Sequence, residues 1–366
     1  MIFAILLLIF TIFYCLAVIF VGYLLSRSQK TMPFGDTYVS IIIAARNEAK
    51  RIKPAIDSLQ YLNYPKHLYE VIWVDDNSED ETADILSKTI SENENWHLIR
   101  LGESNPNLKG KKQALRIAIG QAKGEIILTT DADCRVQKNW IRSVLSAFDA
   151  DTAMVLGHSL LERTNDITGV LLRFDNLFSA IMVAAPALAG FPISSVGRNM
   201  AYRKDAYEGS GGYDKLLHFK SGDDVHLTEL FRQKVKGKIT FCASGDSFTY
   251  TQPPEKLSEI LHQQIRKNSK LLKKSVQSIL LTAYLFLYHA GLIAFPFIIP
   301  DLFDFWLFLV GLKLISEFIV LAYSSVKFKE KGLILFIPFM QLFYPVYVII
   351  LALTGSLQIF KWKDRI

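Results

Sequence analysis

EIILTTDADCR, residues 125–135, is the stretch that decides the fold. Its first six residues form a short, largely apolar run that is rich in β-branched side chains, which predicts a buried strand. The run ends on Asp131 and Asp133, and two carboxylates cannot both point into an apolar core without partners. We therefore expect both acids in a crevice beyond the carboxyl edge of a sheet, where open α/β sheets bind ligands. Such oxygen ligands suit Mg²⁺ or Mn²⁺ bridging to a diphosphate, whereas the simpler alternative is an acidic turn.

The chain around this stretch alternates between expected strands and expected helices. The strands are predicted at residues 39–45, 70–74, 96–101 and 125–130. This alternation is typical of an α/β fold with a mostly parallel, doubly wound sheet. The second strand also ends on two acids, Asp75 and Asp76. Two strands that end in paired carboxylates favour a binding site over an acidic turn that arose by chance.

The composition indicates a membrane protein with a soluble middle. Of the 366 residues, 51% are hydrophobic, and the apolar residues gather at the two ends of the chain. The net charge of +6 is modest, and the basic residues crowd beside the apolar ends, which indicates a membrane surface as partner and no nucleic acid. The three cysteines lie far apart, so they predict neither a disulfide framework nor a zinc site.

Residues 1–25 contain no charged side chain and are long enough to cross a bilayer as a helix. A cleaved signal peptide would have a basic start and a small-residue cleavage site, so the prediction is a retained transmembrane anchor. Arg27 and Lys30 follow the anchor at once. By the positive-inside rule, the soluble domain of residues 36–252 then lies in the cytoplasm.

The C-terminal third also has the pattern of a membrane protein. Residues 255–274 predict a basic amphipathic helix in the headgroup layer, and residues 276–353 predict three transmembrane segments before a basic tail at 354–366. The expected segments are 276–299, 302–323 and 333–353. Lys313 and Glu317 are four residues apart and can form an ion pair on one helix face. Three crossings would leave the tail outside, against the positive-inside rule, so its side stays open. We expect a multi-pass protein of the cell membrane.

Seven motifs occur in an order that resembles one known family. They are VSIIIAARNE from residue 39, VIWVDDNSEDET from 71, GKKQAL from 110, LTTDADC from 128, VGRNMAYRK from 196, SGDDVHL from 221 and QQIRK from 263. This order resembles the membrane-embedded family 2 glycosyltransferases with the GT-A fold. The resemblance implies a Rossmann-like GT-A catalytic domain. It also implies inverting, metal-dependent transfer from a nucleotide-diphosphate sugar, with UDP-sugars as the first choice, to a lipid or membrane-associated glycan.

The resemblance also implies which residues bind the nucleotide sugar. Ala44 and Glu48 match the region that lines the uracil and ribose pocket. Asp76, with Asp75 before it, matches the acid that bonds the base, and a carboxylate is a good acceptor for an imide N–H. Lys111 matches a lysine near the phosphates. The alternatives are a helix-capping turn for Asp75 and a solvated charge at a helix start for Lys111.

Four further acids match the catalytic positions of the family. Asp133 matches the direct ligand of Mg²⁺ or Mn²⁺, and Asp131 matches a position nearer the ribose or the donor sugar. Asp224 matches the general base, and Asp223 is expected to cap the helix or support its neighbour. One positioned carboxylate suffices for a single inverting displacement, whereas a retaining route would need a second carboxylate as nucleophile. Acids at a helix start also have a simpler reading as helix caps.

The last motif departs from the family pattern. Gln263 and Arg266 match a Gln-x-x-Arg pair, in which arginine can contact a diphosphate bidentately. Lys267 stands where the family has a tryptophan that commonly stacks on the acceptor sugar of polymerising enzymes. Its absence favours transfer of a single sugar over processive synthesis. Asn199 is expected either at the acceptor site or in a role that stabilises its loop.

Two other functions compete with this reading. A membrane transporter or channel module with a soluble nucleotide-sensing domain would use the Lys313/Glu317 pair, but it leaves the acids at the strand ends unexplained. A nucleotidyltransferase of similar fold would need a glycine-rich, basic phosphate loop after its first strand. The segment AARNEAKRI at that place contains no glycine, which disfavours this function.

Overall fold

The computed structural model describes residues 1–27, 35–102, 110–164, 166–219, 222–254, 276–343 and 346. The chain divides into a helical unit, residues 1–26 and 253–366, and a sheet unit, residues 27–252. The expected interfacial helix at 255–274, with Gln263 and Arg266, lies outside the described residues. The tail at 354–366 and most of the last expected transmembrane segment lie outside them as well.

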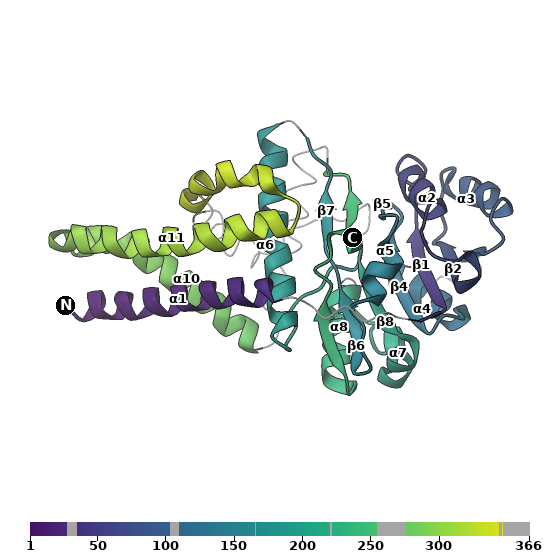
Figure 1. Cartoon of the computed structure of the whole chain (residues 1–366), viewed down its shortest axis with the longest axis horizontal. Coiled ribbons are helices and arrows are strands. Elements are labelled where there is room, and N and C mark those ends of the chain that lie inside the picture. The colour runs from purple at the N-terminus through teal and green to yellow at the C-terminus, as the bar shows by residue number, and fades with distance from the viewer. Residues whose placement is uncertain are drawn as a thin grey trace. The chain divides into compact units, whose positions relative to one another are not determined.

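The sheet unit is built on a seven-stranded, mostly parallel sheet with the strand order β3-β2-β1-β4-β8-β6-β9 (Figure 1). Among the described strands of this sheet, β8 alone runs antiparallel to its neighbours. A smaller sheet has the order β5-β10-β7. The elements of the unit are β1 (Val39–Ala45), α2 (Lys53–Gln60), β2 (Tyr69–Asp75), α3 (Thr82–Ser91), β3 (Trp96–Arg100), α4 (Lys111–Gln121), β4 (Ile126–Asp131), β5 (Cys134–Arg135), α5 (Trp140–Leu145), β6 (Thr152–Leu156), β7 (Ser159–Leu161), α6 (Ile167–Leu188), β8 (Met200–Arg203), α7 (Lys204–Ser210), α8 (Asp223–Lys234), β9 (Lys238–Phe241) and β10 (Thr249–Thr251).

The central strands are buried along their length, as expected for a parallel sheet that helices cover. All seven residues of β2 are buried, and so are six of the seven in β1. The core between them is filled by large side chains such as Trp73 and Trp140, both fully buried. At the amino end of these strands, the buried Glu70 accepts hydrogen bonds from Ser40 Oγ and from the Lys123 N–H, each at 2.6 Å. The four strands predicted from the first half of the domain are confirmed by this sheet.

The segment from residue 152 to residue 161 forms two strands that belong to different sheets. β6 belongs to the large sheet and β7 belongs to the small one, with Gly157 and His158 between them. A Cβ atom at Gly157 would lie 2.5 Å from the side chain of Asn199, so only glycine fits where the chain passes this residue. The change of sheet is therefore set by a contact between segments about forty residues apart, which local patterning does not contain.

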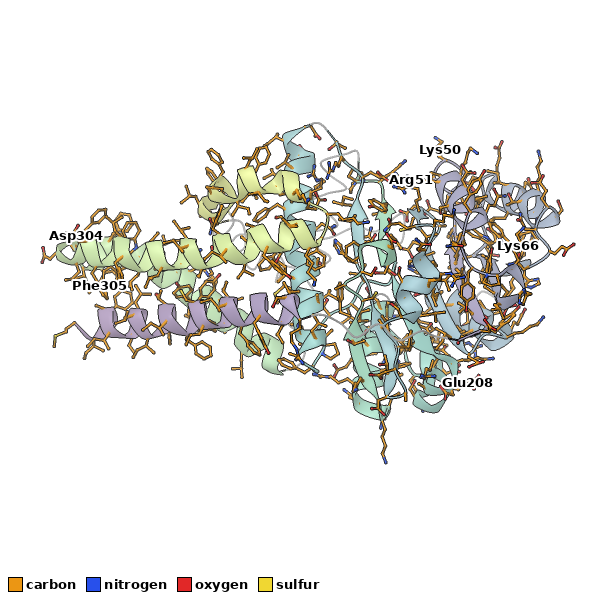
Figure 2. All side chains as sticks on the ribbon, viewed as in Figure 1. Lys50, Arg51, Lys66, Glu208, Asp304 and Phe305 are labelled. Carbon is orange, nitrogen blue, oxygen red and sulfur yellow. The ribbon has the colours of Figure 1, made fainter. Side chains whose placement is uncertain are left out.

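The helical unit contains α1 (Ile2–Ser26), α10 (Val276–Ile298), α11 (Phe303–Lys327) and the 3₁₀ helix η6 (Lys331–Phe336). α1 packs beside α11 and α10 (Figure 1). Apolar side chains project outward from α1 and α11, and the polar Asp304 lies at the start of α11 (Figure 2). The expected ion pair is present, since Lys313 Nζ lies 2.8 Å from Glu317.

Three of the described helices are long and apolar enough to cross a membrane: Ile2–Ser26, Ile167–Leu188 and Pro300–Lys327. The first and third agree with expected transmembrane segments. The second is α6, which the sequence placed in the soluble domain. It is 44% buried over its most apolar window, against 17% and 22% for the other two, because it packs on β6, β7 and β9.

Candidate active site

The first predicted site residues along the chain lie at one edge of the sheet. Because β1, β2 and β4 are parallel and in register, Ala44 lies between Val74 and Asp131, and Ala45 lies beside Asp75. This edge is the carboxyl edge, where open α/β sheets bind ligands.

The loops after β1 and β2 hold each other in place. Asn47 and Asn77 both adopt left-handed backbone angles, with φ of 53° and 56°. The side chain of Asn47 accepts from the Glu79 N–H at 2.8 Å, and the Glu48 N–H donates to Thr82 Oγ1 at 2.9 Å. These cross-loop bonds place Glu48 beside the start of α3, at the edge where its role was predicted.

At the ends of β1 and β2, and in the loops that follow them, three side-chain polar atoms are buried without a hydrogen-bond partner among the described residues. They are Asp75 Oδ1, Arg46 Nη1 and Asn77 Nδ2. Leaving a buried polar group unpaired costs about 1–3 kcal/mol, so such a group is expected to meet a ligand or water. The side chain of Asp75 combines this unpartnered acceptor with one long bond, in which Oδ2 accepts from the Ser78 N–H at 3.4 Å.

Asp76 makes different contacts from those of Asp75. Both of its oxygens accept the Gly110 N–H at 3.1 Å. Gly110 precedes α4 and has a φ of 102°, a backbone angle that favours glycine. Asp76 therefore ties the end of β2 to the start of α4, and the acid with an unpartnered oxygen is its neighbour Asp75.

Lys111 joins acids from two distant motifs. Its Nζ contacts Asp131 at the end of β4 and lies 3.5 Å from Asp223 Oδ2 at the start of α8. Burial alone would lower the pKa of Lys111. The negative charges of Asp131, Asp223 and Asp224 outweigh it and raise that pKa above its usual value. The lysine is thus a fixed cation within an acid cluster and not the solvated charge of the alternative reading.

Asp223 and Asp224 occupy the first turn of α8, after Gly222 with a φ of 78°. The Gly197 N–H donates to Asp224 Oδ2 at 3.1 Å, and the Val225 N–H donates to Asp224 Oδ1 at 2.9 Å. Two N–H donors therefore orient this carboxylate, one of them from the loop before β8. The bond from Val225 is the contact expected if Asp224 only capped the helix. The bond from Gly197 links Asp224 to the loop before β8.

Asp133 offers the oxygen chemistry of a metal ligand. No described residue forms an ion pair with it, and its Oδ1 accepts only a weak bond from the Cys134 thiol at 3.4 Å. Burial, and after it the charge of Asp133, raises the pKa of the Cys134 thiol well above its usual value. Among the described residues, no group of three His, Cys, Asp or Glu side chains could hold a metal alone. Mg²⁺ and Mn²⁺ nevertheless fit here, because such ions often take one or two carboxylates and complete their shell with substrate phosphates.

For Asn199 the structure favours the loop-stabilising role over the acceptor site. Its side chain is 2% exposed and donates to the carbonyls of His158 and Ser247 at 2.7 and 2.8 Å. Its Oδ1 accepts from Trp140 Nε1 at 3.1 Å. All polar atoms of the amide form hydrogen bonds within the protein, so none is available to bind an acceptor substrate.

Two contributors to this geometry had no assigned role in the motifs. Gly197 supplies the N–H that orients Asp224, and a Cβ there would approach Asp224 Cβ to 3.2 Å. Lys112, 8% exposed, donates to the carbonyl of Phe219 and holds the segment before Asp223. Both residues stand inside quoted motifs, but their partners lie far along the chain.

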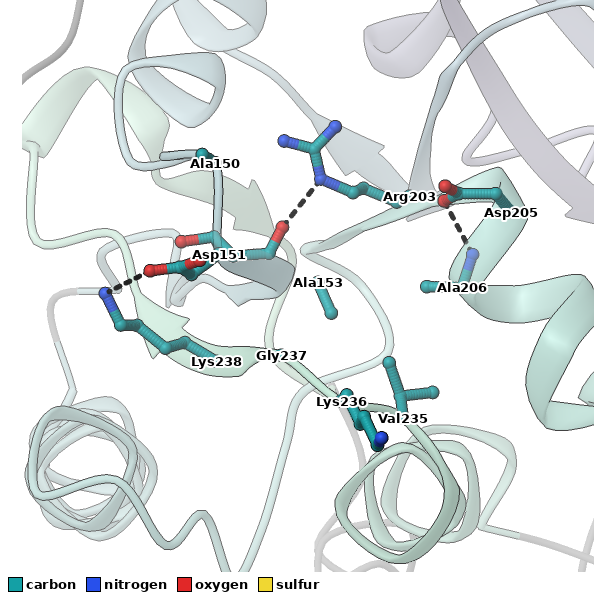
Figure 3. Close-up of a pocket in the computed structure, with 11 residues that line it drawn as sticks. Ala150, Asp151, Ala153, Arg203, Asp205, Ala206, Val235, Lys236, Gly237 and Lys238 are labelled. Atoms are coloured by element: carbon teal, nitrogen blue, oxygen red, sulfur yellow. Dashed lines mark hydrogen bonds and ion pairs between the residues drawn. The ribbon is translucent and has the colours of Figure 1, made fainter.

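A surface hollow of about 790 Å³ lies at the opposite edge of the sheet (Figure 3). It is lined by residues before β6, after β8 and before β9, and Arg203 pairs with Ile126 at the start of β4. Arg203 Nε donates to the Thr152 carbonyl at 2.9 Å, and Lys238 lies 3.6 Å from Asp151. None of the predicted site residues lines this hollow.

Comparisons with known proteins agree with this fold and these motifs. Residues 40–207 match the model of Glycosyl transferase family 2. The glycosyltransferase AglE of Haloferax volcanii is 27% identical over 199 residues, which cover 54% of this chain and 61% of that protein. A beta-monoglucosyldiacylglycerol synthase of Trichormus variabilis is 35% identical over 123 residues, 34% of this chain and 26% of that protein.

A solved mannosyltransferase from Pyrobaculum calidifontis, in complex with GDP-Man and Mn²⁺, has the same fold. Its TM-score is 0.60 at 19% identity, with 97% of this chain and 98% of that chain covered. The likeness confirms the GT-A fold expected from the sequence. The two curated relatives extend beyond the matched segments, of which the longer covers 61% of its protein. The stretch of this chain that matches the model of Glycosyl transferase family 2 carries β1 to β4 and the Asp131/Asp133 motif.

Proposed function

We propose that this chain is an inverting, metal-dependent glycosyltransferase that moves a sugar from a nucleotide-diphosphate sugar, most readily a UDP-sugar, to a lipid or membrane-associated glycan. The observation that carries the proposal is the contact of one lysine with two acid motifs. Lys111 contacts Asp131 and lies 3.5 Å from Asp223, which gathers motifs some ninety residues apart. A donor diphosphate, a metal and an acceptor hydroxyl need this combination of acids and a cation in one place.

The nucleotide base would be read by the unpartnered atoms at the ends of β1 and β2. Asp75 Oδ1 can accept from an imide N–H, and Arg46 Nη1 and Asn77 Nδ2 can donate to the flanking carbonyl oxygens. This donor and acceptor pattern suits uracil, and Ala44 leaves room beside it. Asp76 then supports the site by holding the start of α4.

Asp133 would hold Mg²⁺ or Mn²⁺ together with the oxygens of the donor diphosphate. When bound, the metal would offset the negative charge that develops on the leaving diphosphate. Asp131, in contact with Lys111, would face the ribose or the donor sugar. Mn²⁺ is the first ion to test, because the mannosyltransferase of the same fold was solved with it.

Asp224 would act as the general base. It takes the proton of the acceptor hydroxyl while the new bond to the anomeric carbon forms and the bond to the diphosphate breaks. The Gly197 N–H keeps the carboxylate directed to this task. A retaining route would need a second carboxylate as nucleophile, and Asp131 and Asp223 are both engaged by Lys111. This division of roles supports inversion.

A lipid or membrane glycan is the acceptor that fits the rest of the chain. The relative of Trichormus variabilis is named for a glucosylated diacylglycerol, and α1 and α11 have the length and hydropathy of membrane helices. Lys267 in place of tryptophan supports transfer of a single sugar. The sheet unit would face the cytoplasm of a multi-pass membrane protein, with Gln263 and Arg266 at the membrane surface.

The charged pair in the helical unit does not favour a transporter. Glu317 contacts Lys313, the Tyr14 hydroxyl and Gln341, so the two charges bond to neighbours in the same unit. Such a closed network holds helices together and offers no open path for a substrate.

The test uses the full chain in detergent with Mn²⁺ or Mg²⁺ and a panel of UDP- and GDP-sugars, and it measures release of nucleoside diphosphate. Asp224→Asn should lower the rate about 10²–10⁴-fold and leave donor binding unchanged. Asp133→Ala should weaken metal-dependent donor binding. Asp57→Asn, a change of an exposed aspartate in a surface pair with Lys53, is the matched control and should behave as wild type.

Full activity in both site variants would refute the assigned function. Equal losses of donor binding in Asp133→Ala and Asp224→Asn would refute the division between metal ligand and base. Retention of the anomeric configuration in the product would refute the inverting mechanism.

A further inference from the structure

Arg198 stands beside the candidate base, although neither the motifs nor the comparisons assign it a role. The residue before it, Gly197, donates its N–H to Asp224 Oδ2 at 3.1 Å. The residue after it, Asn199, is anchored in the core by two backbone carbonyls at 2.7 and 2.8 Å. The backbone of Arg198 is therefore held between the core and the base, and its partly exposed side chain leaves from that place.

The strand register brings Arg198 to the acid end of β4. β8 pairs antiparallel with β4, and the last aligned pair is Thr129 with Met200. Two further steps along the two chains reach Asp131 on one and Arg198 on the other. The arginine thus lies at the same edge of the sheet as the acids of the site.

The charge of Arg198 affects the pKa values of two other side chains, His158 and Cys134. It acts on His158, where burial, followed by the arginine, lowers the pKa of the imidazole to about 3. It also acts on Cys134, where it opposes the rise that burial and Asp133 cause in the pKa of the thiol. The guanidinium is therefore close enough to influence His158 and Cys134, the residue next to Asp133.

No described residue forms an ion pair or hydrogen bond with the Arg198 guanidinium. Lys111, the other cation of the site, contacts Asp131 and approaches Asp223. An arginine that lies at the same sheet edge as these acids and pairs with none of the described ones has donors available for another anion. Guanidinium groups bind phosphate bidentately, which a lysine ammonium does not reproduce.

We propose that Arg198 binds a phosphate group of a substrate in this site. The inference deepens the proposed function and rests on it. Two sources carry the same chemistry: the diphosphate of the donor and a phosphate group on the lipid or glycan acceptor. In the first case Arg198 stabilises the leaving group, and in the second it selects phosphorylated acceptors.

The first arm of the test measures binding of UDP and GDP to the full chain in detergent with Mn²⁺, by calorimetry, with uridine and guanosine as probes that lack phosphate. If Arg198 binds the donor, Arg198→Ala weakens nucleoside diphosphate binding about 10- to 100-fold, in keeping with the loss of a charge-assisted contact. Nucleoside binding stays unchanged, and Arg198→Lys recovers part of the loss. Arg232→Gln, which removes the same charge from an ion pair with Glu229, is the matched control.

The second arm measures binding of decyl phosphate, with decyl glucoside as the uncharged probe, while UDP and Mn²⁺ are saturating. If Arg198 serves the acceptor, Arg198→Ala loses decyl phosphate binding by a similar factor and keeps UDP binding. Circular dichroism checks the fold of each variant, and Arg198→Gln, closer in volume to arginine, replaces the alanine variant if that one is unfolded.

Wild-type affinity of Arg198→Ala and Arg198→Gln for both phosphate probes would overturn the proposal. A wild-type protein that binds neither probe would overturn it as well. If the wild type binds decyl phosphate but no nucleoside diphosphate, the glycosyltransferase proposal fails, and the alkyl phosphate arm still decides the role of Arg198.

Discussion

Replacing Lys111 with methionine should expose the repulsion within the acid cluster that this lysine neutralises. Its Nζ contacts Asp131 and lies 3.5 Å from Asp223, with side-chain exposures of 36%, 28% and 22% for the three residues. Removing one partner of a fully buried pair costs about 3–5 kcal/mol, whereas exposed pairs contribute about 0–1 kcal/mol. At this intermediate exposure we expect Lys111→Met to lower the free energy of unfolding by about 1–2 kcal/mol.

The pH dependence of this loss follows from the raised pKa of Lys111. Burial lowers this pKa, but the surrounding carboxylates outweigh burial and raise it above the unfolded value of about 10.4. A cationic group whose pKa is higher in the folded state contributes its full stabilisation below its unfolded-state pKa. This stabilisation disappears only as the pH rises through the folded-state pKa. The difference between Lys111→Met and wild type should therefore be constant from about pH 6 to pH 9.

Thermal unfolding of the full chain in detergent, followed by circular dichroism, measures the effect. For a domain of this size, 1–2 kcal/mol corresponds to a fall in Tm of about 2–8 °C. Mn²⁺ should raise the Tm of Lys111→Met more than that of wild type, because the acids then lack their ammonium partner. Lys53→Met, which breaks an exposed pair with Asp57, is the control. If Lys111→Met has the Tm and the Mn²⁺ response of Lys53→Met, the lysine does not neutralise the cluster.

Two further predictions concern buried ionisable side chains. Burial, followed by the charge of Arg198, lowers the pKa of His158 to about 3, so below about pH 6.5 the unfolded chain binds a proton that the folded chain does not. The free energy of unfolding should then fall by about 1.4 kcal/mol for each pH unit below this value. Urea unfolding of His158→Gln should show a smaller dependence on pH. An unchanged dependence would contradict a neutral buried imidazole. Lys313→Met should destabilise the helical unit by about 3–5 kcal/mol, because it leaves Glu317 buried and without its cation. The double variant Lys313→Met/Glu317→Gln should recover much of this loss in thermal unfolding, and a larger loss would show that the pair itself stabilises the unit.

Local patterning predicted the part of the fold that local physics decides. The runs that became β1, β2 and β4 are short, apolar and rich in β-branched residues, and such runs are stable only between layers of helices. The acids that follow β2 and β4 were predicted at the carboxyl edge because parallel strands end together there. Local patterning also predicted the Lys313/Glu317 pair, since residues four apart share a helix face.

Other features depend on residues that meet only after folding. The chain passes from β6 to β7 at Gly157, where the side chain of Asn199 excludes a Cβ atom. Asn199 itself is used by the core, which its place in a motif did not reveal. The helix α6 has the hydropathy of a membrane segment and yet packs on the sheet, because hydropathy does not distinguish a buried face from a lipid-facing one.

By itself, the sequence determined the α/β class, the likeness to a known family and the presence of acids at the strand ends, because each depends on short runs of residues. Only the tertiary structure decided which partners each of these acids contacts. Asp75 keeps an unpartnered oxygen while Asp76 bonds Gly110, since the turn after β2 aims the two side chains differently. EIILTTDADCR predicted two acids at an edge, but the lysine that joins Asp131 to Asp223 comes from another strand–helix unit. Charges from distant motifs interact through space, and pairing over such separations is fixed by the fold and not by local pattern.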